Sequence, residues 1–509
     1  MIISLSVLVI TIIVSGTYAL YKAQLSKNIG VNTTTHGLAY YINYVKGTDI
    51  TAATLNPSTS YESGASSDIE FWKKDDSYDI YGKIDLTVNT IGTNLKNSPA
   101  LKYAVVNNGN VLSTGSLKGT TSGSKVTILK NLYLEQTKQI YTVYVWLDNS
   151  EELGNISNES LSISVDCTAS LQKEPAADTI ISLYTSAAKV TATNNSITYN
   201  TAPSVSLMND RLGGTTTDLD GGNIRYYGAN PNNYIYFNCS DYSNQTSSTC
   251  ETWRIIGVFD GKLKLIKGSQ IGTYSWDNKN ISTGAEDDRG KNDWTTARLM
   301  KLLNPDDYYI NDNNDKDSEG NYLGYSLYYN SASGMCFTDE GVNYSACDFT
   351  STGIKNDETR NMIAETTYNL GGWNDTGVYP NEIYEYERGT TVYTGRPTTW
   401  TGKIALAYPS DYGYAADLNQ CKQTLANYDN STCTSNNWMK AIITDNGSNH
   451  GWLLTPDSSY SYGAWYSQGN VGEYFTGAAR GAVPVLSLSS KLGIESGDGS
   501  SSNPYKLSA

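Results

Sequence analysis

The run Ile140–Leu147, IYTVYVWL, is built mainly of aromatic and β-branched residues and contains no charge. Such residues pack well on a pleated surface, so the run predicts a buried central strand. Lys83–Val88 and Leu161–Val165 alternate polar and apolar residues, which is typical of strands with one buried face. Asn108-Gly109 lies between two apolar segments and predicts a tight hairpin. Together these patterns predict an all-β sandwich over residues 22–170.

The composition of the whole chain agrees with a β-rich protein outside the cytoplasm. A length of 509 residues indicates two or three domains, and 39% hydrophobic residues suffice for cores. Gly, Asn, Ser, Thr and Tyr are abundant, which favours strands and turns over helices. The net charge of -15, without a basic stripe, argues against binding of nucleic acid or of an anionic lipid surface.

The cysteines have a regular spacing. Six of the seven bracket polar stretches of nearly equal length, and Cys167 is left over. Six cysteines allow fifteen pairings, but the short spacings favour three local disulfides. Buried free thiols are an alternative, whereas zinc is disfavoured because the spacing is wrong and the chain has two histidines. Disulfides imply an oxidising, extracellular location. The expected pairs are Cys239–Cys250, Cys336–Cys347 and Cys421–Cys433.

The N-terminal segment Met1–Tyr21 contains no charged residue. About twenty apolar residues suffice to span a bilayer, and Thr17-Tyr18-Ala19 also offers a small-residue cleavage pattern. Residues 1–21 are therefore expected to be either a signal peptide or a transmembrane anchor, and membrane contact is expected only there. No Lys or Arg precedes the apolar run, so Met1 is not fixed as the true start.

The C-terminal part of the chain differs in composition from the sandwich region. Residues 171–222 are polar and rich in glycine towards their end, which predicts a linker. Residues 223–509 hold eight of the ten tryptophans and all three cysteine brackets, and they predict an α+β domain. Asp260-Gly261 predicts a hairpin, and Asp293–Asn304 and Asn356–Leu370 predict helices.

The sandwich region resembles the camelysin/TasA-type surface proteins of Gram-positive bacteria. The resemblance depends on the leader ending TYAL, on YTVYVWLDN at Tyr141–Asn149, and on LSISV at Leu161–Val165. It implies a β-sandwich that assembles into biofilm fibres. The metalloprotease activity described for camelysin is not expected, because the chain has no H-E-x-x-H motif.

The C-terminal region shows the order W-L-x-x-P, A-W, G-x-V and P-V-L. These residues are Gly451–Pro456, Ala464-Trp465, Gly469–Val471 and Pro484–Leu486. The order resembles the C-type-lectin-like fold shared by formylglycine-generating enzymes and bacterial variable adhesins. That fold implies a loop-rich platform for binding, although a fold alone does not give a function. The copper-binding cysteines of the enzyme have no evident match here.

Catalytic residues are not expected. Nucleophilic triads need a positioned imidazole, and His450 is the one histidine of the larger domain. It stands beside a predicted strand, where a turn or rim position is the simpler interpretation. The pair Asp287-Asp288 could serve glycoside hydrolysis, but solvated surface acids are expected in so acidic a chain. We therefore predict a protein that is not an enzyme.

A calcium site is one interpretation of the acidic loop Asp306–Gly320, and a solvated acidic loop is the other. Asp315, Asp317 and Glu319 alternate ahead of a glycine, as in calcium loops. The bidentate glutamate that such loops carry at their twelfth position is missing, because Ser326 stands there. No other cofactor is expected.

A cluster of aromatic residues near the C-terminus is the candidate ligand-binding site. Tyr460, Tyr462, Trp465 and Tyr466 lie close together in the sequence, and His450 precedes them. Aromatic faces beside amides and carboxylates suit the recognition of sugars or proteins. For the tryptophan, packing in the core is the alternative.

The predicted architecture is multidomain, with an N-terminal apolar helix, an all-β sandwich and an α+β C-type-lectin-like domain. The primary hypothesis is an exported, non-catalytic adhesin of the bacterial cell surface that binds an extracellular glycan or protein. A fibre or pilus-like subunit that self-associates is the second hypothesis, although Leu5 stands where pilins use Glu. A secreted enzyme of the formylglycine-generating type is the third.

Overall fold

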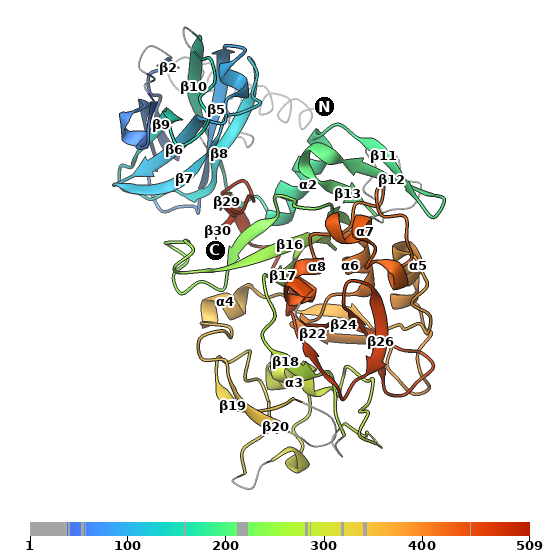
Figure 1. Ribbon diagram of the computed structural model, residues 1–509. Coiled ribbons are helices and arrows are strands. Elements are labelled where there is room, and N and C mark those ends of the chain that lie inside the picture. Colours follow the sequence, from blue (N-terminus) through green and yellow to red (C-terminus); the bar gives the residue numbers. More distant parts are fainter. Residues whose placement is uncertain are drawn as a thin grey trace, which may run out of the picture. The chain divides into compact units, whose positions relative to one another are not determined.

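The computed structural model of the protein describes residues 38, 41–51, 55, 57–156, 159–210, 222–279, 283–285, 287–316, 320–338, 344–447 and 449–508. The described part is mostly β, with several antiparallel sheets (Figure 1). It divides into two compact units. The first comprises residues up to Glu174 together with Gly493–Asp498, and the second comprises Pro175–Leu492 with Gly499–Leu507. The predicted leader, residues 1–21, lies outside the described residues. Where the structure describes the chain, no helix is long and apolar enough to span a bilayer.

The first unit contains two sheets with the strand orders β1-β4-β9-β6-β7 and β2-β10-β5-β8. Their apolar faces share one core. The neighbours are antiparallel, except that β3 pairs with β9 in parallel. The strands are β1 (Ile42–Val45), β2 (Ile50–Thr51), β3 (Pro57–Ser58), β4 (Ala65–Lys73), β5 (Tyr81–Ile91), β6 (Leu101–Asn107), β7 (Asn110–Ser116), β8 (Lys125–Tyr133), β9 (Ile140–Asp148) and β10 (Leu161–Ser170).

The local sequence patterns in this unit are confirmed. The aromatic and β-branched run forms β9, which lies in the middle of its sheet between β4 and β6. Asn108 and Gly109 connect β6 to β7 with φ of 49° and 78°. Both angles lie in the left-handed region, which asparagine and glycine tolerate best.

The end of the chain returns to the first unit, which the sequence did not indicate. Strand β29 (Gly493–Ser496) packs beside β8. Asn131 of β8 donates from its amide to the carbonyls of Ile494, at 2.9 Å, and Glu174, at 3.0 Å. Its side-chain oxygen accepts the N–H of Glu174. One buried amide therefore connects three separate segments.

The second unit contains a nine-stranded sheet of order β11-β12-β13-β14-β16-β17-β28-β23, with β15 paired to β16, and a five-stranded sheet of order β18-β27-β24-β25-β26. Two further antiparallel pairs of strands are the β19-β20 hairpin and β21-β22, whose strands are separated in the sequence by α5 (Pro380–Glu387). The strands are β11 (Val190–Asn194), β12 (Ile197–Ala202), β13 (Leu207–Asn209), β14 (Ile224–Tyr226), β15 (Tyr234–Phe237), β16 (Glu251–Phe259), β17 (Lys262–Lys267), β18 (Thr273–Ser275), β19 (Ser333–Phe337), β20 (Tyr344–Asp348), β21 (Thr366–Asn369), β22 (Thr399–Gly402), β23 (Ile404–Ala405), β24 (Gly451–Pro456), β25 (Gly463–Ser467), β26 (Val471–Phe475), β27 (Ala479–Gly481), β28 (Val485–Ser487) and, near the end of the chain, β30 (Lys506–Ser508).

The helices of this unit are short. They surround a core that includes the apolar residues of β24, β25 and β28. The predicted hairpin at Asp260-Gly261 connects β16 to β17, again with two positive φ angles, 48° and 70°. The helices are α2 (Ala176–Ser186), α3 (Arg298–Leu303), α4 (Asp357–Met362), α5 (Pro380–Glu387), α6 (Pro409–Tyr414), α7 (Ser431–Ser435) and α8 (Lys440–Ile443).

The stretch 171–222, expected to be a linker, is largely folded. It contains α2 and the strands β11, β12 and β13, which extend the nine-stranded sheet. Asn195 and Ser196 form the β11–β12 turn with φ of 46° and 61°. The polar strands are stabilised by the ladder and by the buried Tyr199, and not by a continuous apolar pattern. The glycine-rich residues 211–221 are outside the described part.

Two predicted helices are shorter than expected. Residues 293–304 form a helix only over α3, because Asp293 holds the preceding turn by accepting from the N–H and the hydroxyl of Thr295. Within 356–370, α4 ends at Met362. The next residues are drawn into sheet contacts, since Ile363 bridges Leu488 and β21 pairs with β22.

The three predicted disulfides are present, namely Cys239–Cys250, Cys336–Cys347 and Cys421–Cys433. They suggest an oxidising, extracellular environment. Every cysteine of residues 175–492 is thus paired, so this unit offers no thiol of the kind that a formylglycine-generating enzyme uses. Cys167 is buried in the core of the first unit, and burial raises the pKa of its thiol.

Candidate functional site

The outer face of the five-stranded sheet carries exposed aromatic residues. Side chains alternate along β25, so Tyr466 and Trp465 point to opposite faces. Trp465 has 0% exposure and packs in the core, so Tyr466, which is half-buried, lies on the opposite, outer face, where the buried Trp452 stands across the ladder from it. Across the ladder, Tyr474 of β26 stands opposite Ala464, two residues from Tyr466. Tyr474 therefore shares the outer face, where 42% of it is exposed.

Arg480 lies between these rings. Its guanidinium carbon is 3.8 Å from the centroid of the Tyr466 ring and 4.4 Å from that of Tyr474. The His450 ring stacks on Tyr466 at 5.5 Å and 26°, and the Phe475 ring lies 4.1 Å from that of Tyr474. His450 precedes β24, and Arg480 is the middle residue of β27. We call these five residues the Arg480 cluster.

Hydrogen bonding fixes the charge state of the cluster. An Arg480 Nη1 lies 2.6 Å from His450 Nδ1. A guanidinium only donates, so Nδ1 accepts and the neutral imidazole carries its proton on Nε2. Burial, and then the charge of Arg480, lower the pKa of His450, which keeps the ring neutral near pH 7. Burial lowers the pKa of Arg480 too, while Tyr466 and Tyr474 act in the opposite direction.

The turn between β24 and β25 presents a second aromatic pair. Tyr460, 51% exposed, stacks on Tyr462 with the ring centroids 5.6 Å apart. Arg289 covers Tyr462 at 3.8 Å. Asp457 holds the turn, because its Oδ1 accepts the N–H groups of Ser459 and Tyr460 at 2.5 and 2.7 Å. The turn is therefore an ordered surface feature separate from the Arg480 cluster.

A carboxyl group with a raised pKa lies near this turn. Burial, and then Asp457 and Asp375, raise the pKa of Glu473 to about 8. This shift favours the protonated form of Glu473. Asp287 and Asp288, the acid pair considered for hydrolysis, are exposed and pair with Arg289 at 2.5 Å and Lys279 at 3.6 Å.

The sequence-predicted binding residues fall into three groups. His450 and Tyr466 belong to the Arg480 cluster, Tyr460 and Tyr462 form the pair on the turn, and Trp465 is a core residue that has no surface for a ligand. Sequence reasoning missed the remaining members of the cluster. The aromatic character of β26 could have indicated two of them, but only the strand register brings in the arginine. The missed residues are Tyr474, Phe475 and Arg480.

The predicted calcium ligands are not assembled by the described residues. The Asp315 carboxylate is fully buried and is neutralised by Arg298, at 2.5 Å, and Lys301, at 3.2 Å. Tyr325 also donates to it. Asp317 and Glu319 lie outside the described residues. Among the residues that are described, no group of three or more His, Cys, Asp or Glu side chains could hold a metal ion.

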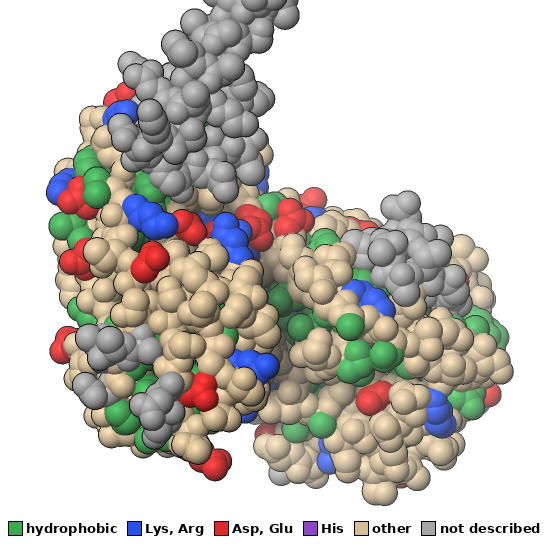
Figure 2. Space-filling view, turned by 90° about the horizontal axis from the view of Figure 1, so that it is seen from above, with side chains coloured by type: hydrophobic (Ala, Val, Ile, Leu, Met, Phe, Trp, Pro, Cys, Tyr) green, Lys and Arg blue, Asp and Glu red, His purple; other side chains and the backbone are tan. Residues whose placement is uncertain are grey.

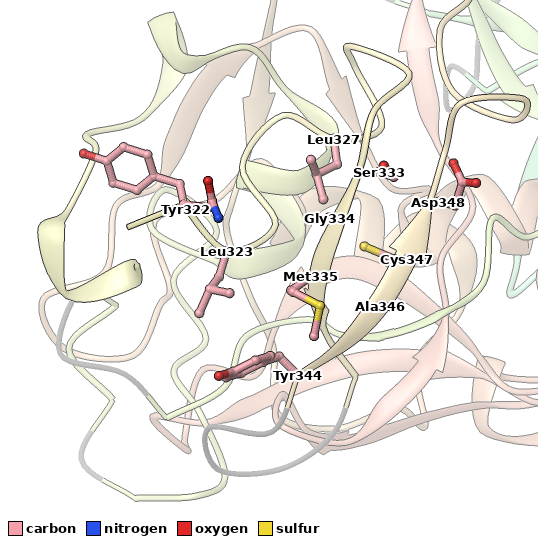
Figure 3. A pocket seen from close by; sticks show the side chains of 11 residues that line it. Tyr322, Leu323, Leu327, Ser333, Gly334, Met335, Tyr344, Ala346, Cys347 and Asp348 are labelled. Carbon is pink, nitrogen blue, oxygen red and sulfur yellow. The ribbon is translucent and has the colours of Figure 1, made fainter. Parts of the chain in front are cut away.

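A cavity of about 920 Å³ lies beside the disulfide-bonded β19–β20 hairpin (Figure 3). Leu323, Met335 and Tyr344 supply its apolar surface, and Ser333 and Asp348 supply polar groups. Nothing in the sequence indicated it, because its walls come from a loop and a hairpin that meet only in the folded chain. Among the described residues that line it, Asp348 is the charged one.

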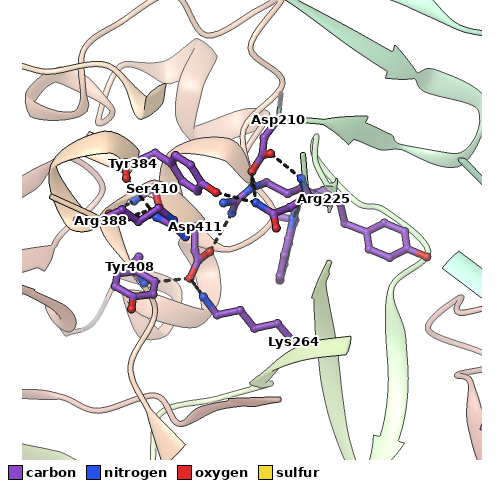
Figure 4. A network of polar contacts seen from close by, with 12 residues as sticks. Asp210, Arg225, Lys264, Tyr384, Arg388, Tyr408, Ser410 and Asp411 are labelled. Carbon is purple, nitrogen blue, oxygen red and sulfur yellow. Dashed lines mark hydrogen bonds and ion pairs between the residues drawn. The ribbon is translucent and has the colours of Figure 1, made fainter. Parts of the chain in front are cut away.

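A buried ionic network connects the nine-stranded sheet to α5 and α6 (Figure 4). Arg225 of β14 pairs with Asp210 at 2.5 Å and with Asp411 of α6 at 2.9 Å, and Lys264 of β17 also pairs with Asp411. The guanidinium of Arg225 lies over the rings of Phe259 and Tyr414. Because every charge of the network is paired or stacked in the interior, we interpret the network as a structural clamp, that is, a set of buried ion pairs that holds α6 against the sheet, and not as an open site.

Comparisons with protein-family models, with curated proteins and with solved structures gave no significant match. The resemblances to camelysin/TasA-type proteins and to C-type-lectin-like domains therefore stay predictions.

Proposed function

We propose that the protein is an exported, non-catalytic binding protein of the cell surface, and that the Arg480 cluster is its ligand-binding face. The single observation that supports this is a stack of aromatic, imidazole and guanidinium groups on the outer side of a sheet. Tyr474 has 42% of its surface exposed on this side. Aromatic rings with polar tips are typical of surfaces that recognise sugars or proteins.

The character of the surface fits an extracellular ligand better than a nucleic acid. On the face drawn in Figure 2, acidic and basic side chains are interspersed and uncharged groups cover most of the area. A nucleic-acid site needs a continuous basic patch. In this proposal the sandwich of the first unit acts as a spacer, and the second unit displays a lectin-like binding face.

Binding by the exported chain to an array of bacterial and host glycans tests the proposal. We expect Tyr474→Ala and Tyr466→Ala to weaken binding about fivefold each, because each removes an aromatic contact worth roughly 1 kcal/mol. Tyr78→Ala removes an exposed tyrosine from the first unit and is the matched control. Binding that is insensitive to both cluster variants would refute this assignment of the site.

A fibre subunit is the second candidate. In the described residues, β1 and β7 are the last strands of their sheet, and such edges can accept a further strand from another molecule. Electron microscopy of the purified exported chain separates the two candidates. Filaments would support the fibre, whereas particles of single molecules would leave the binding protein.

A further inference from the structure

Arg480 differs from the other described arginines in how its charge is satisfied. Five of them pair with carboxylates: Arg225, Arg289, Arg298, Arg360 and Arg388. Arg254 and Arg396 lack such a pair, but both donate to an asparagine side chain and to a backbone carbonyl. For Arg480, the one acceptor among the described residues is His450 Nδ1. Four of its five N–H groups thus have no described acceptor, and the Nε among them is buried.

The groups around Arg480 are also donors. His450 carries its proton on Nε2, because Nδ1 accepts from the arginine. The phenol groups of Tyr466 and Tyr474 can donate as well. No described carboxylate lies within ion-pair distance of the guanidinium. A positive charge surrounded by donors is complementary to an anionic ligand rich in acceptors.

The magnitude of the charge favours a monoanion. The cluster holds one cation, since the imidazole is neutral, and the chain as a whole carries a net charge of -15. A dianionic phosphate would meet more repulsion than one carboxylate and would leave one of its charges without a cation. The planar guanidinium also matches a carboxylate in two parallel hydrogen bonds.

The aromatic surroundings favour a carboxylate that is carried by a sugar. Tyr474 presents its ring 4.4 Å from the guanidinium carbon, and the Phe475 ring lies 4.1 Å from that of Tyr474. Such faces pack against the apolar C–H face of a sugar ring while the arginine holds the acidic group. We infer that the Arg480 cluster binds a sugar bearing a carboxylate, such as a uronic acid. This inference depends on the proposed binding function and specifies its ligand.

Isothermal titration of the full exported chain tests the inference. The probes are an oligosaccharide ending in glucuronic acid, the same oligosaccharide ending in glucose, and a glutamate-rich peptide. We expect the acidic sugar to bind at least about tenfold more tightly than the neutral one, with the preference shrinking at about 0.5 M salt. NMR titration is expected to show that the acidic sugar raises the pKa of His450, because a bound anion favours the imidazolium.

Variants identify the residue responsible. Arg480→Gln is expected to abolish the preference for the acidic sugar while binding of the neutral one persists. Arg480→Lys keeps the positive charge but loses the planar group that can donate two parallel hydrogen bonds to a carboxylate. It is expected to retain part of the preference. Lys279→Gln removes one exposed cation of the same unit and is expected to change nothing, and near-UV circular dichroism shows whether each variant is folded.

The outcomes are distinguishable. Equal binding of both sugars by the wild type, or a preference that survives in Arg480→Gln, overturns the inference and leaves the proposed binding function. Binding of the peptide but of neither sugar also overturns the sugar assignment. Absence of binding to the peptide and to both sugars, together with no binding on the glycan array, overturns the inference and the proposed function.

Discussion

Glu387 and Asp411 are both fully buried carboxyl groups of the second unit, yet their pKa values move in opposite directions. Burial raises the pKa of Glu387 to about 7, against the effects of Arg388 and of Ser410, which donates to both carboxylate oxygens. Burial acts on Asp411 in the same direction. Lys264 and Arg225 outweigh it and hold the pKa of Asp411 below its usual range. The neighbouring charge, and not the depth of burial, decides which acid is ionised.

Glu387 makes the stability of the second unit depend on pH. Its pKa is about 7 in the folded chain against 4.5 for the ordinary group, so between these pH values the native state holds a proton that the unfolded chain has lost. Stability therefore falls as pH rises from about 4.5 to 7, by up to about 3 kcal/mol, and then levels off. Glu387→Gln is expected to lose this slope in urea unfolding followed across that range. An unchanged slope would show that other groups cause it.

Asp411 neutralises two buried cations, so its loss is expected to be costly. Asp411→Asn leaves Lys264 and Arg225 short of an anion in the interior, which typically destabilises by about 3–5 kcal/mol. Asp288→Asn removes a carboxylate from an exposed pair, and we expect a change below about 1 kcal/mol. Equilibrium unfolding in urea measures both. A small effect at Asp411 would mean that water or Asp210 compensates, contrary to the clamp described above.

At the scale of elements, the three disulfides close loops of nearly equal length in different surroundings. Cys421 and Cys433 have no exposed surface and belong to the core of the second unit. Cys336 and Cys347 instead connect the β19–β20 hairpin, whose second strand is largely exposed.

Replacing each pair by alanine is expected to separate loop closure from packing. Loop closure alone is worth up to roughly 3 kcal/mol for either disulfide. We expect the Cys421→Ala/Cys433→Ala variant to lose more stability than Cys336→Ala/Cys347→Ala, because both sulfurs of the former pair lie in the core, whereas Cys347 of the latter is partly exposed. Thermal unfolding by calorimetry compares them. Equal losses would assign the whole effect to loop closure.

Elements with local causes were predictable from the sequence. The turns at Asn108-Gly109 and Asp260-Gly261 have a left-handed backbone, with positive φ angles, and the sequence places residues there that tolerate this conformation. The disulfides followed from spacing. The end of α4 was not predictable, since its next residues are recruited by strands far along the chain. Strands β11 and β12 were not predicted, because they are rich in polar residues and no apolar pattern marks them as strands on either side of the turn at Asn195-Ser196.

At the scale of the whole molecule, the candidate site exists only because four separate segments meet. The stretch 450–466 predicted His450 and Tyr466, whereas Arg480 joins them through the parallel contact of β24 with β27, between Gly451 and Gly481. The pairing of two strands that are distant in the sequence cannot be predicted from the residues of either strand. The assignment of Trp465 to the core likewise needed the sheet, because alternation decides which of two neighbouring aromatic residues faces out.

The return of the chain end to the first unit leads to a prediction at the same scale. Ile494 of β29 is 1% exposed and belongs to the first unit, although it follows more than three hundred residues that belong to the second. Ile494→Ala is therefore expected to destabilise the first unit by about 2–5 kcal/mol, as for other buried large-to-small changes. Ile383→Ala, in the core of the second unit, is the matched control and is expected to affect that unit instead.

Hydrogen exchange followed by mass spectrometry reports on the two units separately in the full chain. Faster exchange in β5, β8 and β10 of the Ile494→Ala protein, with unchanged rates in β24 and β25, is the expected pattern, and Ile383→Ala should give the reverse. Exchange that accelerates only in the last residues of the chain would mean that β29 lies on the sandwich without stabilising it. In that case the first unit would be complete at Glu174, and its fold would not depend on the synthesis of the C-terminus.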